Sequence, residues 1–143
     1  MSSFAIVTDS TANLPKAFIE KQGIYVLPLT WISGEKEYSG SMEGEREAYA
    51  LFYEEKHIST SMSNQRTAQK LVQKLLSEEK DILYIGLSSK LSGTFHMMER
   101  VLGYEAKKYP ERKWYAVDSF AIGLGEGSLV FDAAKIRRRG EDI

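Results

Sequence analysis

The sequence predicts an α/β protein in which helices cover both faces of a mostly parallel sheet, giving three layers, α/β/α. Two short apolar runs, residues 4–8 and 82–87, have the length and composition of strands that are buried on both faces. Amphipathic helical spacing occupies residues 65–78 and 95–106, on either side of the second run. Strands that alternate with helices form right-handed βαβ units, and such units build a parallel sheet.

The first half of the chain alternates short strands with helices and polar turns. After the strand at residues 4–8, Asn13 can cap a helix that has Pro15 in its first turn and Gly23 at its end. Residues 24–31 are predicted to form a strand, in which Pro28 favours an edge position or an irregularity because proline donates no backbone hydrogen bond. The remaining predictions are a turn at 33–34, a return strand at 36–38, a loop at 39–44, a helix at 45–56 packed through Ala48, Leu51 and Phe52, and a loop at 58–64.

The second half shows clearer periodicity. The stripe of Ala68, Leu71, Val72, Leu75 and Leu76 predicts the helix at 65–78. The strand at 82–87 leads into a helix with Phe95, Met98, Leu102 and Ala106 on one face, and a strand at 113–117 precedes a last helix at 124–139, which Gly140 ends. We expect residues 1–143 to form one domain.

Composition excludes several classes of function. The 19 basic and 20 acidic residues nearly cancel, so the total charge carries no sign of nucleic-acid binding. The basic run 137–139 is expected to complement the dipole at a helix end. The absence of cysteine excludes disulfides, thiol catalysis and thiolate metal sites. With no membrane-spanning run and no signal-peptide pattern, the expected location is the cytoplasm.

Hydroxyl groups dominate the predicted rim of the sheet. Ligands of such sheets bind beyond the carboxyl ends of the strands. There the sequence places Ser10, then Ser92, Gly93 and Thr94 at the start of a helix, whose free N–H groups suit an anionic oxygen. The loop with Thr60 and Ser61 can reach the same edge. The alternative is that Ser92 only caps the helix.

Catalytic interpretations are weaker. Asp9 and Asp118 could hold Mg²⁺ against a phosphate, although strand-end carboxylates more often cap turns. His57 and His96 are better explained as surface or packing residues than as bases. The glycines of residues 123–127 lack the context of a dinucleotide fingerprint, and close helix packing explains them better. No catalytic residue, metal ligand or cofactor is assigned.

Several motifs, in this order along the chain, resemble the DegV family of bacterial fatty-acid-binding proteins. They lie at residues 6–15 (IVTDSTANLP), 23–29 (GIYVLPL), 34–38, 60–61 (TS), 88–94 (SSKLSGT), 117–119 (VDS), 123–125 and 133–135. The resemblance covers nearly the whole chain and implies a Rossmann-like N-terminal domain of the DegV fold.

The resemblance also implies a function. Family members bind one long-chain fatty acid in a tunnel between two α/β domains, and many present it to a separate fatty acid kinase. Here the carboxylate-holding residues correspond to Thr60, Ser92 and Gly93, with Ser61, Ser10 and Thr94 as a second tier. The leading hypothesis is therefore a non-enzymatic lipid-binding domain without a cofactor.

Three departures from the family pattern affect this hypothesis. Met62-Ser63 replaces Gln-Pro after the Thr-Ser pair, the acidic, glycine-containing segment at residues 39–46 is unlike the usual family pattern, and the chain ends about where the second domain is expected. A groove lined by Phe95, Met98 and Leu91 is then expected beside the Ser92 helix, so that the chain either self-associates over it as a homo-oligomer or binds fatty acid only weakly. The alternative is that Phe95 and Met98 pack entirely against the sheet, as the helix periodicity allows. The alternatives are a Mg²⁺-dependent small-molecule phosphatase or phosphotransferase, and an interaction domain without ligand.

Overall fold

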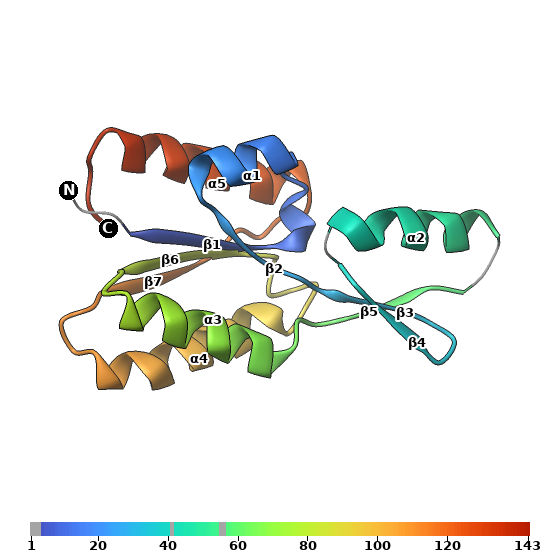
Figure 1. Cartoon of the computed structure of the whole chain (residues 1–143), viewed down its shortest axis with the longest axis horizontal. Helices are drawn as coiled ribbons and strands as arrows, with labels where there is room; N and C mark the ends of the chain where they lie inside the picture. Colours follow the sequence, from blue (N-terminus) through green and yellow to red (C-terminus); the bar gives the residue numbers. More distant parts are fainter. Residues whose placement is uncertain (1–3, 41, 55–56) are drawn as a thin grey trace.

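The computed structural model describes residues 4–40, 42–54 and 57–143, and its main sheet, sheet A, has four parallel strands. The strands lie in the order β2-β1-β6-β7, so β1 and β6 are central (Figure 1). In register, Val7 lies beside Tyr25 on one side and beside Tyr84 on the other. The bounds are β1 (Ala5–Asp9), β2 (Tyr25–Leu27), β6 (Ile82–Gly86) and β7 (Trp114–Asp118).

Helices cover both faces of sheet A, which confirms the predicted three layers (Figure 1). Alternate residues of each central strand point to opposite faces. Val7 and Tyr84 therefore join the core under α3 (Gln65–Ser77) and α4 (Thr94–Glu105). Ile6 and Ile85 join the core under α1 (Lys16–Gln22) and α5 (Leu124–Arg138). Two short 3-10 helices, η1 (Ser10–Ala12) and η2 (Ala106–Lys108), complete this part.

A three-stranded antiparallel sheet, sheet B, extends beyond the end of sheet A together with α2 (Met42–Tyr53) (Figure 1). It consists of β3 (Thr30–Ser33), β4 (Lys36–Ser39) and β5 (Ser59–Ser61), in the order β4-β3-β5. We call this part the arm. The predicted irregularity at Pro28 is confirmed, because the strand expected at 24–31 breaks there into β2 and β3. The hairpin at Ser33-Gly34 is also confirmed.

Some predicted boundaries are wrong. Residues 58–64 are not all loop, because β5 pairs with β3 and sets Ser61 beside Thr30, a contact between distant segments. Asn13 does not cap α1. Instead it ends η1 in the left-handed conformation, at φ 49°, and α1 follows Pro15.

The helix predicted at 45–56 begins at Met42, so the loop expected at 39–44 is shorter than predicted. Phe52 is 69% exposed, contrary to its expected packing, and the side chain of Ala48 and residues 55–56 lie outside the described part. Gly23 ends α1 as predicted, at φ 56°.

Candidate functional site

The carboxyl edge of sheet A contains the point where strand order reverses. The chain passes from β1 to β2 on one side and later returns to β6 on the other, so the crevice lies beyond Asp9 and Gly86. Ligands of open α/β sheets bind at this kind of crevice. The segments that leave the two strands here are η1 and residues 87–93, and they contain three of the predicted site residues, Ser10, Ser92 and Gly93.

Residues 88–94 form a compact turn that opens α4. The Ser92 amide donates to the Ser88 carbonyl at 3.2 Å, while the Ser92 Oγ lies 3.0 Å from the Thr94 Oγ1 and accepts from the Thr94 amide. Ser92 thus satisfies one amide of the helix start, as the capping alternative requires. Within the described part of the chain, no backbone carbonyl accepts a hydrogen bond from the amides of Gly93, Phe95 and His96. The turn therefore keeps donors available for an anion.

The loop after β5 meets this turn. The Ser63 amide donates to the buried Thr94 Oγ1 at 3.3 Å. The Met62 Sδ lies 3.4 Å from the position that a Cβ on Gly93 would take. Thr60 lies two residues before Met62 on β5, and its side chain is exposed. The structure thus brings the two predicted hydroxyl-rich loops into contact, through residues 62–63 and 93–94.

Ser63 is a candidate residue that the sequence analysis missed. Its side chain is 1% exposed, and its Oγ has no hydrogen-bond partner among the described protein atoms. A buried hydroxyl without a partner is costly, so it indicates a missing acceptor or donor. The only signal in the sequence was its position within the hydroxyl-rich loop, two residues after Ser61.

Ser10, a second-tier candidate, forms a hydrogen bond at the base of the arm. Its Oγ accepts a hydrogen bond from the Leu29 amide at 3.0 Å, and the Gly40 amide donates to the Leu29 carbonyl at 2.6 Å. A Cβ on Gly40 would lie 2.5 Å from that carbonyl oxygen and 3.0 Å from the Ser10 Oγ. Ser10 therefore fastens the base of the arm to sheet A.

Asp9 ends β1 inside the protein. The Tyr84 hydroxyl donates to its carboxyl group, with oxygen–oxygen distances of 2.9 and 3.0 Å, and the Leu87 amide donates to it at 2.8 Å. Burial raises the pKa of Asp9 to about 6, against the lowering effect of these bonds from Leu87 and Tyr84. With both oxygens engaged by protein donors, Asp9 anchors the start of the segment that leads to Ser92.

Asp118 is also engaged by backbone donors. It accepts hydrogen bonds from the amides of Ser89 and Phe120, at 3.2 and 3.0 Å. Burial works to raise the pKa of Asp118, but the hydrogen bonds from Ser89 and Phe120 outweigh it, so the net pKa is lowered. Among the described residues, no group of three or more His, Asp and Glu side chains has the placement of a metal site. Asp118 thus shapes the turn, as strand-end carboxylates commonly do.

A second buried carboxyl group, Glu126 in the first turn of α5, was not foreseen. Thr8 and Thr11 donate to its two oxygens at 3.2 and 2.7 Å. Burial raises the pKa of Glu126 to about 7, the hydrogen bond from Thr11 lowers it, and the charge of Asp9 raises it further. The burial of Glu126 is not predictable from the sequence, because acidic residues are common in the first turn of an exposed helix. The predicted close packing is confirmed, since a Cβ on Gly127 would lie 2.5 Å from the Ala12 carbonyl oxygen.

The apolar groove expected beside the Ser92 helix is not found, and the alternative, in which Phe95 and Met98 pack against the sheet, is confirmed. Phe95 is 6% exposed and Met98 is fully buried, because both pack into the core between α4 and sheet A. Only Leu91, at 64% exposure, remains on the surface. His57 and His96 are both exposed.

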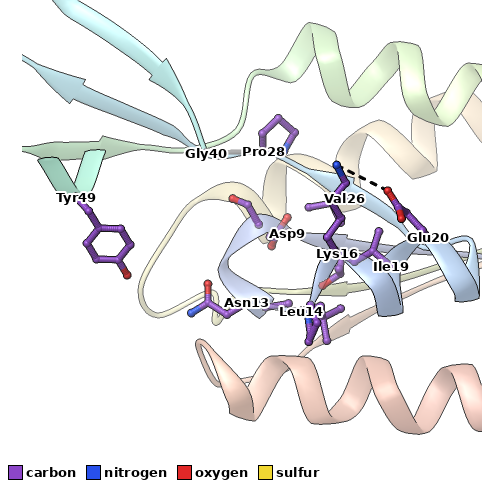
Figure 2. Close-up of a pocket in the computed structure, with 14 residues that line it drawn as sticks. Asp9, Asn13, Leu14, Lys16, Ile19, Glu20, Val26, Pro28, Gly40 and Tyr49 are labelled. Atoms are coloured by element: carbon purple, nitrogen blue, oxygen red, sulfur yellow. Dashed lines mark ion pairs between the residues drawn. The ribbon is translucent and has the colours of Figure 1, made fainter. Parts of the chain in front are cut away.

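The same edge of the sheet contains a cavity of about 690 Å³, on the α1 side. Figure 2 shows it between η1, α1 and β2, with Tyr49 of α2 lying across from Ile19 and Val26. The carboxyl group of Asp9 lies at its inner end. No helix in the described ranges has the length and apolar character needed to cross a bilayer.

Comparison with known proteins gives a consistent result. A family model described as an uncharacterised protein of the DegV family matches residues 3–143. The DegV domain-containing protein YteA of Lactococcus lactis is 31% identical over 144 residues, which cover 99% of this chain and 50% of that protein. The chain spans about half the length of the curated relatives that it matches.

Solved structures agree with this match. A DegV family protein from Thermus thermophilus, described as binding fatty acid, has a TM-score of 0.82 and 27% identity over 98% of this chain and 49% of that chain. DegV from Bacillus subtilis, described as a fatty acid binding protein, has a TM-score of 0.83 and 25% identity over the same shares.

Proposed function

The chain belongs to the DegV family, and from this membership we propose that it binds the carboxylate of a long-chain fatty acid between residues 60–63 and 92–94. The observation that carries the proposal is the buried Ser63 hydroxyl, which has no protein partner in the described part and adjoins the Ser92 turn through Thr94. The amide of Gly93 and the hydroxyls of Thr60 and Ser92 supply further donors. The relatives described as fatty-acid-binding support the choice of ligand.

The chemistry of these groups suits a carboxylate. Hydrogen bonds from hydroxyls and amides to an ionised acceptor are shorter and stronger than those between neutral groups. The helix start adds a favourable dipole. Neutral donors hold the anion without transferring a proton to it, so the acid stays chemically unchanged. The proposed role is therefore binding, with no catalytic step by this chain.

Two finer parts of the proposal rest on the family resemblance alone. We propose that residues 1–143 act as one domain of the binding protein, and that the bound acid is presented to a separate fatty acid kinase. The Mg²⁺-dependent alternative gains no support from the structure, because the carboxylates of Asp9 and Asp118 are engaged by protein donors.

We expect Ser92→Ala, Thr60→Val and Ser63→Ala each to weaken fatty acid binding by roughly 1–3 kcal/mol, about 5-fold to 150-fold, because each removes a donor to a charged acceptor. Isothermal titration calorimetry with palmitate measures the change in affinity.

Ser77→Ala and Thr67→Val are the matched controls. Both residues are exposed on α3 and lie outside the proposed site, so the affinity should be unchanged. Unaltered affinity in all three site variants would remove these side chains from the site and refute the proposal.

A further inference from the structure

β7 is an edge strand of sheet A, and its outer side is open (Figure 1). Just beyond the strand, the Ser119 amide donates to the Gly86 carbonyl at 3.1 Å. In a parallel pair, every second residue bonds to the same neighbour, so the backbone groups of Trp114 and Ala116 point away from β6. Among the described residues, no strand pairs with this outer side. β7 therefore offers free backbone donors and acceptors to another strand.

The open edge lacks the usual protection against pairing. Natural edge strands are commonly protected by charged side chains, proline or a bulge, but residues 114–117 (WYAV) include neither a charge nor a proline. The charges that flank them are engaged within the chain. The Lys113 Nζ lies 3.4 Å from the Asp142 Oδ2, and Asp118 accepts hydrogen bonds from backbone amides. An apolar edge with free backbone groups suits the addition of a strand.

One face of β7 is also uncovered. Trp114 and Ala116 pack against the core under α3 and α4. Successive side chains of a strand point to opposite faces, so Tyr115 and Val117 lie on the face that carries α5, where they are 54% and 40% exposed. On this face α5 packs over β1 and β6, the two central strands. Within the described part of the chain, β7 thus has a helical cover on the α4 side alone.

Further exposed apolar side chains extend this face. Leu129 and Ile136 lie on the side of α5 opposite to Phe131, which contacts Phe18 of α1, so they lie on the side towards β7. Two more exposed residues follow β7 in the segment that leads to α5. We call the whole set the edge patch: Tyr115, Val117, Phe120, Ile122, Leu129 and Ile136.

The edge patch is large enough for a stable interface. At roughly 100 Å² of exposed area for each side chain, one copy offers about 600 Å² and two copies offer about 1,200 Å², before the backbone of β7 is counted. Stable protein interfaces bury roughly 1,200–2,000 Å² in total. Apolar patches of this size on a protein surface commonly mark an interaction site.

We propose that a second copy of this chain covers the edge patch, in a two-fold dimer whose β7 strands pair in antiparallel orientation. A two-fold axis at Ala116 pairs the outward backbone groups of the two strands and sets Tyr115 opposite Val117 of the second copy. An aromatic residue opposite a β-branched residue is a favourable cross-strand pair. The pairing joins two four-stranded sheets into one of eight strands and removes both open edges. This inference goes beyond the proposed function, and the edge patch shares no residue with 60–63 and 92–94.

Light scattering after size exclusion, over a dilution series, measures the mass of the unaltered chain. We expect twice the 16.2 kDa of one chain, with dissociation on dilution. Val117→Lys places an ammonium group at the pairing edge and should raise the dissociation constant of the dimer at least roughly tenfold. Phe52→Lys, at an exposed position of α2, is the matched control and should leave the dimer unchanged. Circular dichroism checks that both variants are folded.

Disulfide trapping tests the register. The chain has no cysteine, so an introduced thiol can pair only with a thiol of another copy. Directly opposite residues that exchange no backbone hydrogen bonds have Cα atoms about 4.5 Å apart, within the range of a disulfide. A mixture of Tyr115→Cys and Val117→Cys chains should therefore be cross-linked by mild oxidation faster than either variant alone.

Two outcomes contradict the proposal. A monomer at every concentration overturns the inference and leaves the edge patch to a different protein. A dimer that Val117→Lys leaves intact, and that the mixed cysteine variants do not trap, has another interface and overturns it as well.

Discussion

Asp9→Ala is expected to lower the free energy of unfolding at about pH 5 by roughly 2–4 kcal/mol, because it leaves the Tyr84 hydroxyl and the Leu87 amide without their acceptor in the interior. Asp9 and Tyr84 are both fully buried, so water cannot easily replace the lost bonds. The cavity that the shorter side chain leaves lowers the free energy of unfolding further. Urea unfolding followed by circular dichroism measures the change.

At acidic pH the test isolates the contribution of the hydrogen bonds that Asp9 accepts. Below its raised pKa of about 6, Asp9 is mostly neutral in the folded protein, so the substitution removes hydrogen bonds without removing a buried charge. At about pH 8 the loss should be smaller, because the substitution also removes the cost of burying the ionised carboxyl group. Asp132→Ala, at an exposed position of α5, is the control and should change stability little. If the Asp9→Ala protein were as stable as the unaltered protein at both pH values, the role of Asp9 as an anchor would be contradicted.

The unaltered protein is expected to lose roughly 4 kcal/mol of stability between about pH 5 and pH 8 from two buried carboxyl groups. The folded-state pKa values are about 6 for Asp9 and about 7 for Glu126, above the ordinary values of 3.8 and 4.5. Between the ordinary and the raised values the folded protein binds more protons than the unfolded chain. Stability therefore falls as the pH rises through this window, and it recovers on acidification. Thermal unfolding across this pH range measures the effect.

The double variant Asp9→Asn/Glu126→Gln is the control for this prediction. The amide oxygens can still accept hydrogen bonds from Tyr84 and Thr11, but neither side chain titrates. Its stability should vary much less between about pH 5 and pH 8. A steep fall that persists in the double variant would assign the pH dependence to other groups.

Asp9 and Glu126 connect the segments that surround the proposed site. The Asp9 carboxyl ties the end of β1 to Leu87, and the turn at Ser92 and Gly93 follows five residues later. Glu126 ties α5 to β1 and η1 through Thr8 and Thr11. Both carboxyl groups thus stabilise the crevice without offering a free oxygen to a ligand.

Local sequence patterns determined most of the elements. The apolar run at 82–87 and the periodic helices after residues 65 and 94 are found within one or two residues, because side-chain spacing alone selects strand or helix there. The turn at Ser92, Gly93 and Thr94 was also predictable, since it joins a buried strand to a helix start.

Only the tertiary structure decided the contacts between distant segments. β5 exists because residues 59–61 pair with β3, about 30 positions earlier, and no local propensity predicts that pairing. The assignment of Ser10 to the arm, the unpaired Ser63 hydroxyl and the burial of Glu126 depend in the same way on partners that are remote in the chain. Periodicity placed Phe95 and Met98 on one helix face, but only the packed core decided that this face is buried. Spacing fixes which residues share a side of an element, whereas long-range packing fixes what that side meets.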